Sequence, residues 1–148
     1  EEVAGIVLED SSHPDQDARF LAVLPPESPG DSSDLKELRQ WLNTPQHDLG
    51  GIDWEISCAQ VRQVKSLGDI PLIVLSAALS TSVWGAIPEK ITKQLDQEKL
   101  EMRKELTRLS SNSTQIMATT TNHNIHFDEP QLVINAIIEL VNAARNKK

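Results

Sequence analysis

The sequence predicts an α/β fold with a parallel sheet, and three observations lead to that class. Three short apolar runs stand along the chain, at residues 3–8, 70–75 and 114–119. Segments with apolar residues at helical spacing separate these runs and follow the last one. The resulting order of strand, helices, strand, helix, strand and helix is typical of parallel strands joined by right-handed crossovers.

The three expected strands differ in how strongly their residues mark them. Residues 3–8 form a continuous apolar run that ends at polar residues, so we expect a central strand buried on both faces. In the run 70–75, Pro71 stands near the start, where a strand can forgo a ladder hydrogen bond. Residues 114–119 are weaker but carry β-branched residues at both ends. Three strands are too few for such a sheet, so we expect an unpaired edge and apolar faces.

The long segment between the first two strands predicts an inserted lid or cap. Its 15–66 span exceeds what a crossover with one helix needs, and its entry is rich in proline. A helix is expected over 34–42, with Ser33 or Asp31 as its cap. A second, shorter helix is expected over 54–65.

Two further helices are expected in the second half of the chain. Residues 88–109 place apolar side chains on one stripe, and the charged positions from Glu98 to Arg108 are expected to form a solvated face. The last helix begins near Pro130, with Asp128 as its cap and Gln131 as the capping-box partner. Its apolar positions from Leu132 to Ala144 fall on one face.

Composition limits the classes of partner and site. The chain has 148 residues, with 14 Lys and Arg against 22 Asp and Glu, a net charge of −8 that argues against nucleic acid and anionic membranes. The single cysteine, Cys58, excludes an intrachain disulfide framework and any multi-cysteine metal site, and it is expected to be a small buried apolar residue. With no signal peptide and no apolar window long enough to span a membrane, the default location is cytoplasmic.

Candidate functional residues stand in the loops that follow the strands. Ligands of open α/β sheets bind beyond the carboxyl ends of the strands, which selects residues 9–15, 76–84 and 120–128. An Asp after one strand and a His after another is the arrangement in which a carboxylate orients an imidazole as general base. The pattern His123-x-x-His126-x-Asp128 lacks the helical frame of two-His zinc motifs, so no metal site is expected. The candidates in the first and third loops are Asp10, His13, Asp15, His123, His126 and Asp128.

Three segments resemble the C-terminal half of the α/β-hydrolase family. Residues 2–16, EVAGIVLEDSSHPDQ, are similar to that family's sixth core strand and the loop after it. Residues 67–75, LGDIPLIVL, are similar to the seventh strand, and residues 110–133, SSNSTQIMATTTNHNIHFDEPQLV, resemble the last strand, catalytic-histidine loop and C-terminal helix. The resemblance implies a partial α/β-hydrolase fold with three parallel core strands, flanking helices and a helical cap insert. Its parts would be a core strand and acid loop at 1–14, the cap at 15–66, and the C-terminal core at 67–148.

The resemblance also implies roles for two residues. His123 matches the catalytic base, although Asn122 stands where the family more often has Gly. Residues 76–80, after the seventh strand, offer no carboxylate, so Asp10 matches the triad acid of the minority of members that place it after the sixth strand. Asp15 is the nearby alternative.

Two parts of the family pattern are missing from this chain. The nucleophile elbow needs Gly-x-Ser-x-Gly, and no two of the six glycines are four apart; the oxyanion loop lies further upstream in the family. The resemblance therefore implies part of a serine carboxylic-ester hydrolase acting on a small ester, with no cofactor and with its Ser upstream, so that this chain alone is inactive or a very poor catalyst. One alternative is a haloalkane-dehalogenase-like hydrolase with an Asp nucleophile. Another is a non-catalytic half-domain that pairs through its sheet edge with itself or with a separate N-terminal half.

Overall fold

The computed structural model describes residues 3–44, 51–78, 85–120 and 122–146. The chain divides into two units, each assembled from separate stretches of sequence. Unit 1 consists of Glu1–Ser12, Lys65–Leu79 and Arg103–Lys148, and unit 2 consists of His13–Val64 and Ser80–Met102. Unit 2 thus contains nearly all of the insert expected at 15–66 together with a stretch that the sequence assigned to the C-terminal core.

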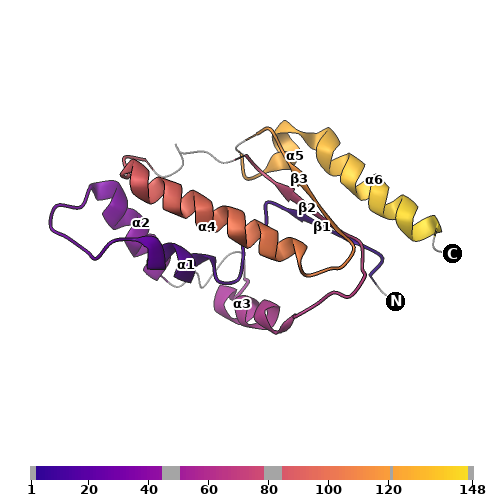
Figure 1. Ribbon diagram of the computed structural model, residues 1–148, viewed down its shortest axis with the longest axis horizontal. Coiled ribbons are helices and arrows are strands. Elements are labelled where there is room, and N and C mark those ends of the chain that lie inside the picture. Colours follow the sequence, from indigo (N-terminus) through magenta and orange to yellow (C-terminus); the bar gives the residue numbers. More distant parts are fainter. Residues whose placement is uncertain (1–2, 45–50, 79–84, 121, 147–148) are drawn as a thin grey trace. The chain divides into compact units, whose positions relative to one another are not determined.

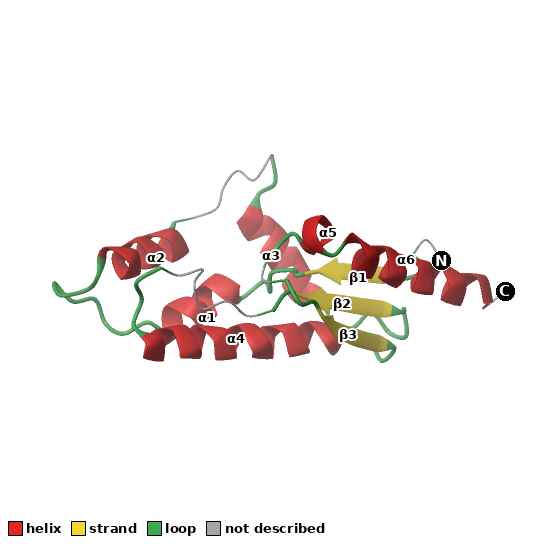
Figure 2. Cartoon of the chain, turned by 90° about the horizontal axis from the view of Figure 1, so that it is seen from above, coloured by secondary structure: helices red, strands yellow, loops and turns green. Residues whose placement is uncertain are grey.

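Unit 1 contains the parallel sheet that the sequence predicts. Its strands are β1 (Ile6–Glu9), β2 (Leu72–Ser76) and β3 (Ser113–Met117), in the spatial order β1-β2-β3 (Figure 1 and Figure 2). The register pairs Ile6 with Leu72 and Leu72 with Ser113. The prediction of three parallel strands with flanking helices is confirmed.

The central position belongs to β2, so the expectation of a central first strand is wrong for the described sheet. Every residue of β2 is buried, whereas the residues of β1 are half-buried. The reason is that β2 has a hydrogen-bonded neighbour on each side, while β1 pairs with β2 alone among the described strands. The apolar run at the start of the chain therefore lies at an edge.

Side chains of β2 alternate between two apolar layers, as the pleat of a strand requires. Ile73 and Leu75 pack with residues of helix α6 (Pro130–Asn146), including Ala136 and Leu140. Leu72 and Val74 point to the other layer, where they pack with Leu106 at the end of helix α4 (Glu89–Thr107). The sheet of unit 1 is therefore covered on both faces.

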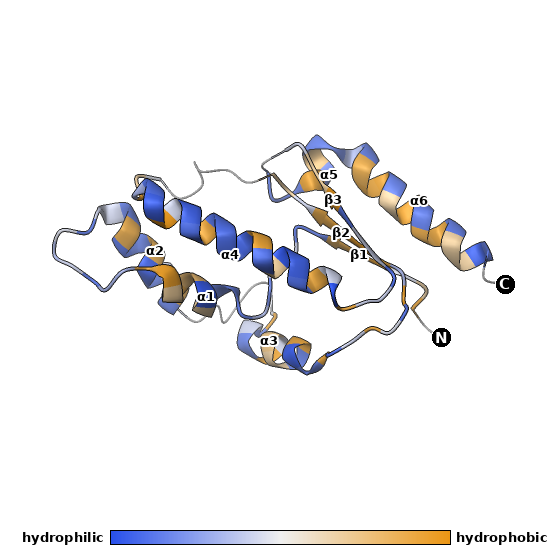
Figure 3. Cartoon of the chain, viewed as in Figure 1, coloured by the Kyte–Doolittle hydropathy of each residue, from blue (hydrophilic) through white to orange (hydrophobic). Residues whose placement is uncertain are grey.

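Unit 2 is helical. It contains α1 (Gln16–Val23), α2 (Ser33–Asn43), α3 (Trp54–Gln63) and the first part of α4, which is mostly hydrophilic with apolar residues at intervals (Figure 3). The expected helices 34–42, 54–65 and 88–109 are confirmed, with ends that differ by at most two residues. Its core comprises Phe20, Leu24, Leu35, Leu38, Leu42, Ile87, Ile91, Leu95 and Met102.

Two helices are absent from the sequence prediction. Helix α1 has eight residues, of which Phe20 is buried, and no side chain caps its N-terminus, so its signal is weak. Helix α5 (Ile125–Asp128) is a single turn that precedes α6. No helix among the described residues is long and apolar enough to cross a membrane.

The helix caps also differ from the expected ones. Ser32, rather than Ser33 or Asp31, caps α2: its side chain accepts a hydrogen bond from the Leu35 amide at 3.2 Å. In place of the capping box expected for α6, Asp128 accepts a hydrogen bond from the Thr120 hydroxyl, and the side chain of Gln131 donates to Asn135. Asp128 thereby connects α5 to the loop after β3.

Candidate active site

Asp10 lies directly beyond the carboxyl end of β1. Its amide donates to the carbonyl of Leu75 at 2.8 Å, which continues the ladder with β2 by one residue. Its φ of 39° lies in the left-handed region, which Asp adopts more readily than most residues and which is often found at functional sites. The turn directs its side chain into the protein, where 3% of it is exposed.

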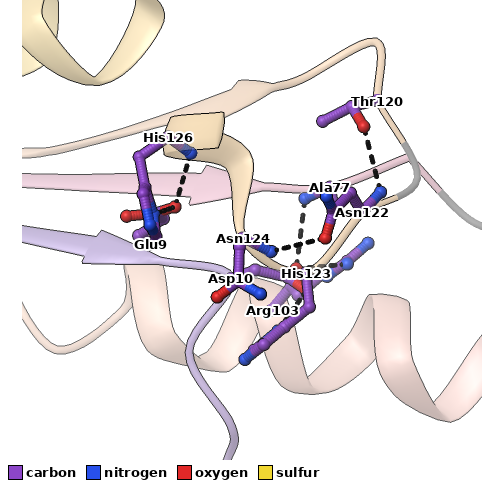
Figure 4. Close-up of polar contacts among 9 residues, drawn as sticks. All are labelled: Glu9, Asp10, Ala77, Arg103, Thr120, Asn122, His123, Asn124 and His126. Carbon is purple, nitrogen blue, oxygen red and sulfur yellow. Dashed lines mark hydrogen bonds and ion pairs between the residues drawn. The ribbon is translucent and has the colours of Figure 1, made fainter. Parts of the chain in front are cut away.

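The two carboxylate oxygens of Asp10 have different partners, as Figure 4 shows. Oδ1 accepts hydrogen bonds from the amide of Ala77 at 3.1 Å and from Nη2 of Arg103 at 2.5 Å. Oδ2 lies 3.0 Å from Nδ1 of His123. The carboxylate therefore joins the ends of β1 and β2, the last turns of α4 and the loop after β3.

The loop that carries His123 is fixed by short-range polar contacts. Asn122 donates its amide to the Thr120 hydroxyl, and its side-chain oxygen accepts from the amide of Asn124, both at 3.0 Å. Glu129 accepts hydrogen bonds from the amides of Thr120 and Thr119 and from the Thr119 hydroxyl, at 2.6–2.8 Å. These bonds, first of all the one from the Thr120 amide, lower the pKa of Glu129 below its ordinary range.

The pairing of His123 with Asp10 is suited to general base chemistry. A carboxylate next to Nδ1 stabilises the tautomer with its proton on Nδ1, which leaves a lone pair on Nε2. The imidazole is 67% exposed, so this second nitrogen is accessible, whereas the carboxylate behind it is buried. A base held in this way can take a proton from a hydroxyl and return it to a leaving group.

The structure brings together His123 and Asp10, which are 113 residues apart, and gives the other candidates different partners. Asp15 belongs to unit 2, where its carboxylate accepts from Nε of Arg62 at 2.6 Å; that hydrogen bond outweighs partial burial and lowers the pKa of Asp15. His13 Nδ1 accepts a hydrogen bond from the Asp15 amide at 3.1 Å. Asp15, the alternative acid, is therefore paired with an arginine.

His126 pairs with a different carboxylate, that of Glu9. Both its amide and its ring Nδ1 lie within 2.8 Å of Oε1 of Glu9. Burial raises the pKa of Glu9, but the hydrogen bonds from His126 and the nearby histidine charges outweigh it, so the pKa is lowered overall. Glu9 and Asp10 are adjacent in sequence, yet each contacts a different histidine, Asp10 contacting His123 and Glu9 contacting His126.

Arg103 is a site residue that sequence reasoning missed. It was expected on the solvated face of its helix, yet 4% of its side chain is exposed and it binds Asp10. A signal was present: Arg103 stands eight positions after Leu95, one after Met102 and three before Leu106, which places it on the apolar stripe. A cation inside such a stripe indicates a buried anionic partner.

Residues 79–84 of the second expected loop lie outside the described residues, and its described part contributes the amide of Ala77. Within the described ranges, no group of three or more His, Cys, Asp or Glu side chains is arranged to bind a metal ion.

A groove runs beside the edge of β1 with which no other described strand pairs. It has a volume of about 620 Å³ and lies between the start of the chain and α6. On its helix side, Ile137 is 49% exposed and Val141 is 41% exposed. The residues that line the groove are Ala4, Gly5, Val7, Ile137, Leu140, Val141, Ala144 and Arg145.

The fold and site define a three-stranded parallel α/β chain with a His–Asp pair at the carboxyl edge of its sheet. No protein-family model and no solved structure matches the chain. It is similar to the uncharacterized protein YqjL of Bacillus subtilis (strain 168), with 37% identity over 83 residues. The match covers 56% of this chain and 29% of YqjL, so the chain spans well under half the length of that relative.

Proposed function

We propose that this chain supplies the general base and the acid of an α/β-hydrolase, most plainly a serine carboxylic-ester hydrolase. His123 would be the base, Asp10 the triad acid, and the nucleophilic Ser would lie outside these 148 residues. The observation that carries the proposal is the 3.0 Å contact between His123 Nδ1 and Asp10 Oδ2 at the carboxyl ends of parallel strands. Small esters are the proposed substrates.

In the proposed reaction, Nε2 of His123 removes the proton of the Ser hydroxyl as its oxygen attacks the ester carbonyl. The carboxylate of Asp10 stabilises the imidazolium that forms. The imidazolium then donates its proton to the departing alkoxide, which leaves an acyl-enzyme, and a water activated by the same base releases the carboxylic acid. The donors that would stabilise the oxyanion also lie outside this chain.

The test uses the complete product of the gene, detected with an antibody against α6. A fluorophosphonate reagent, which labels activated serines, is expected to modify a polypeptide whose mass is well above 16.4 kDa. His123→Ala is expected to abolish labelling and the hydrolysis of nitrophenyl esters, because the nucleophile then lacks its base. His126→Ala is the matched control, since His126 is a neighbouring histidine that contacts Glu9.

Other outcomes select other functions. Release of halide from haloalkanes without fluorophosphonate labelling would indicate an Asp nucleophile, as in the dehalogenase alternative. A native product near 16.4 kDa without labelling would overturn the catalytic proposal in favour of a non-catalytic half-domain. Ester hydrolysis by the 148-residue chain alone, if His123→Ala abolished it, would contradict the proposal that the nucleophile lies elsewhere.

We also propose that the rest of the hydrolase fold pairs with β1, and that a second copy of the chain occupies the same place when the rest is absent. The amides of Ile6 and Asp10 donate to the carbonyls of Pro71 and Leu75, so the backbone groups of these two residues face β2. Backbone groups of successive residues in a strand point to opposite edges, so those of Val7, the residue after Ile6, face the edge away from β2. Apolar side chains of an added strand would fill the groove along α6.

Light scattering after size-exclusion chromatography tests this pairing. The 148-residue chain is expected to have a mass above the 16.4 kDa of a monomer. Ile137→Asp, which places a charge in the groove, should shift the chain toward monomer, whereas Ile134→Asp should not, because Ile134 is similarly exposed on α6 but does not line the groove. A parent chain that is monomeric at all concentrations would refute this pairing.

A further inference from the structure

A buried arginine stands behind the His–Asp pair. Arg103 and Asp10 are 4% and 3% exposed in their side chains, and Nη2 lies 2.5 Å from Oδ1. Arg103 Nη1 is also buried and has no hydrogen-bond partner among the described residues. Because a buried cation is unfavourable unless it is paired, the position of this guanidinium is tied to the carboxylate.

The contacts of Asp10 show what the arginine does for the carboxylate. An Asp side chain rotates easily about its last bond, so its two oxygens can exchange places or tilt. Here Arg103 and the Ala77 amide both bind Oδ1, which leaves Oδ2 directed at His123. With the arginine removed, Oδ1 would keep the hydrogen bond from the Ala77 amide but would lose the charged partner that is buried with it.

We propose that Arg103 is a positioning residue: its buried guanidinium fixes the Asp10 carboxylate so that Oδ2 holds the His123 ring in the tautomer that a general base needs. This inference rests on the proposed hydrolase function. Arginine suits the role better than lysine because its planar, weakly hydrated group binds a carboxylate in a defined orientation.

The experiment measures the tautomer of His123 in the 148-residue chain by two-bond ¹H–¹⁵N correlation, at a pH where the ring is neutral. In the parent, the Nδ1–H form is expected to dominate. Arg103→Met is expected to lower the ratio of Nδ1–H to Nε2–H by about tenfold, which is about 1.4 kcal/mol. Arg103→Lys should lower it by about threefold, since an ammonium keeps the charge without the fixed geometry.

Arg108→Met is the matched control, because Arg108 is exposed shortly after the same helix. It is expected to leave the ratio unchanged. Equal ratios in the parent, Arg103→Met and Arg103→Lys would overturn the inference. If Arg103→Met does not fold, Arg103→Lys decides alone: a lowered ratio supports the positioning role and an unchanged ratio overturns it.

Separate measurements distinguish the positioning role of Arg103 from the proposed hydrolase activity. In the complete enzyme, Arg103→Lys is expected to reduce kcat about threefold with little change in KM, because the substrate does not contact Arg103 in this proposal. If His123→Ala abolishes hydrolysis but Arg103→Lys alters neither kcat nor the tautomer ratio, the positioning role is wrong and the hydrolase function stands. If no hydrolysis or labelling occurs and the ratio still responds to Arg103, the hydrolase function is wrong although the structural coupling is correct.

Discussion

The ion pair between Asp10 and Arg103 makes a quantitative prediction about the stability of unit 1. Asp10→Asn retains an oxygen for the Ala77 amide and tolerates the left-handed backbone, so it removes mainly the charge. At a charge separation of about 4 Å and an effective dielectric constant of about 20, the lost attraction is about 4 kcal/mol. Breaking a buried pair by removing one partner typically costs about 3–5 kcal/mol, and the two figures agree.

The double variant separates pairing from the loss of either side chain. Asp10→Asn combined with Arg103→Met leaves no buried unpaired charge, so it is expected to be at least about 2 kcal/mol more stable than Asp10→Asn alone. Hydrogen exchange of the β2 amides is a suitable assay because it reports on unit 1 itself, and urea unfolding followed by circular dichroism complements it. Single-variant effects that add to within about 0.5 kcal/mol would show that the two groups are not coupled and would refute this reasoning.

Three further predictions concern other residues. The lowered pKa of Glu129 implies that its carboxylate stabilises the folded chain above the ordinary pKa of 4.5, and that this stabilisation is lost as the pH falls through the pKa of the folded state. The urea midpoints of the parent and of Glu129→Gln should therefore converge at acidic pH, and a difference that stays constant with pH would contradict the prediction. Gly85→Ala should destabilise the chain by about 1–2 kcal/mol, because φ is +66° and the new Cβ would meet the Asp34 carboxylate; Gly30→Ala, whose Cβ would make only an ordinary contact with Ser28 Oγ at 3.9 Å and whose φ is not positive, is the control in the same urea assay. Burial raises the pKa of the Cys58 thiol, so it should react with a disulfide reagent more slowly than free cysteine until urea unfolds the chain, and fast reaction of the folded chain would disprove it.

Strands and helices were predictable from the sequence where the hydropathy of a segment matches its burial in the fold. The run 70–75 is apolar at every position except for its proline, and it became the buried β2. The run 3–8 is equally apolar, yet β1 lies at an edge, because the position of a strand in a sheet depends on its neighbours rather than on its own residues. Helix α1 was missed because it buries a single residue, Phe20, whose partners in the core belong to α2 and α4.

Part of the candidate site was also predictable from the sequence. The proximity of Asp10 and His123 could be predicted from the sequence, because parallel strands present their carboxyl ends at one edge of the sheet. The ion pair between Arg103 and Asp10 could not be predicted from the sequence around Arg103, because a charged residue within a highly charged helix is most often exposed to solvent. The stripe position of Arg103 indicated burial, but the identity of its partner depended on packing between segments 93 residues apart.

The interleaving of the two units has a consequence for the order of folding. Ile6 pairs with Leu72, so the first ladder of the sheet closes a loop of more than sixty residues, and the second ladder pairs Leu72 with Ser113. Closing such a loop reduces the entropy of the chain before the contacts of the sheet compensate for it, so parallel sheets with long connections fold slowly. Helical contacts among residues 13–64 shorten the effective loop, so their early formation would speed the sheet. On a ribosome, the carboxylate of Asp10 would emerge long before His123, and the pair could form only after the 113 residues that separate them had been synthesised.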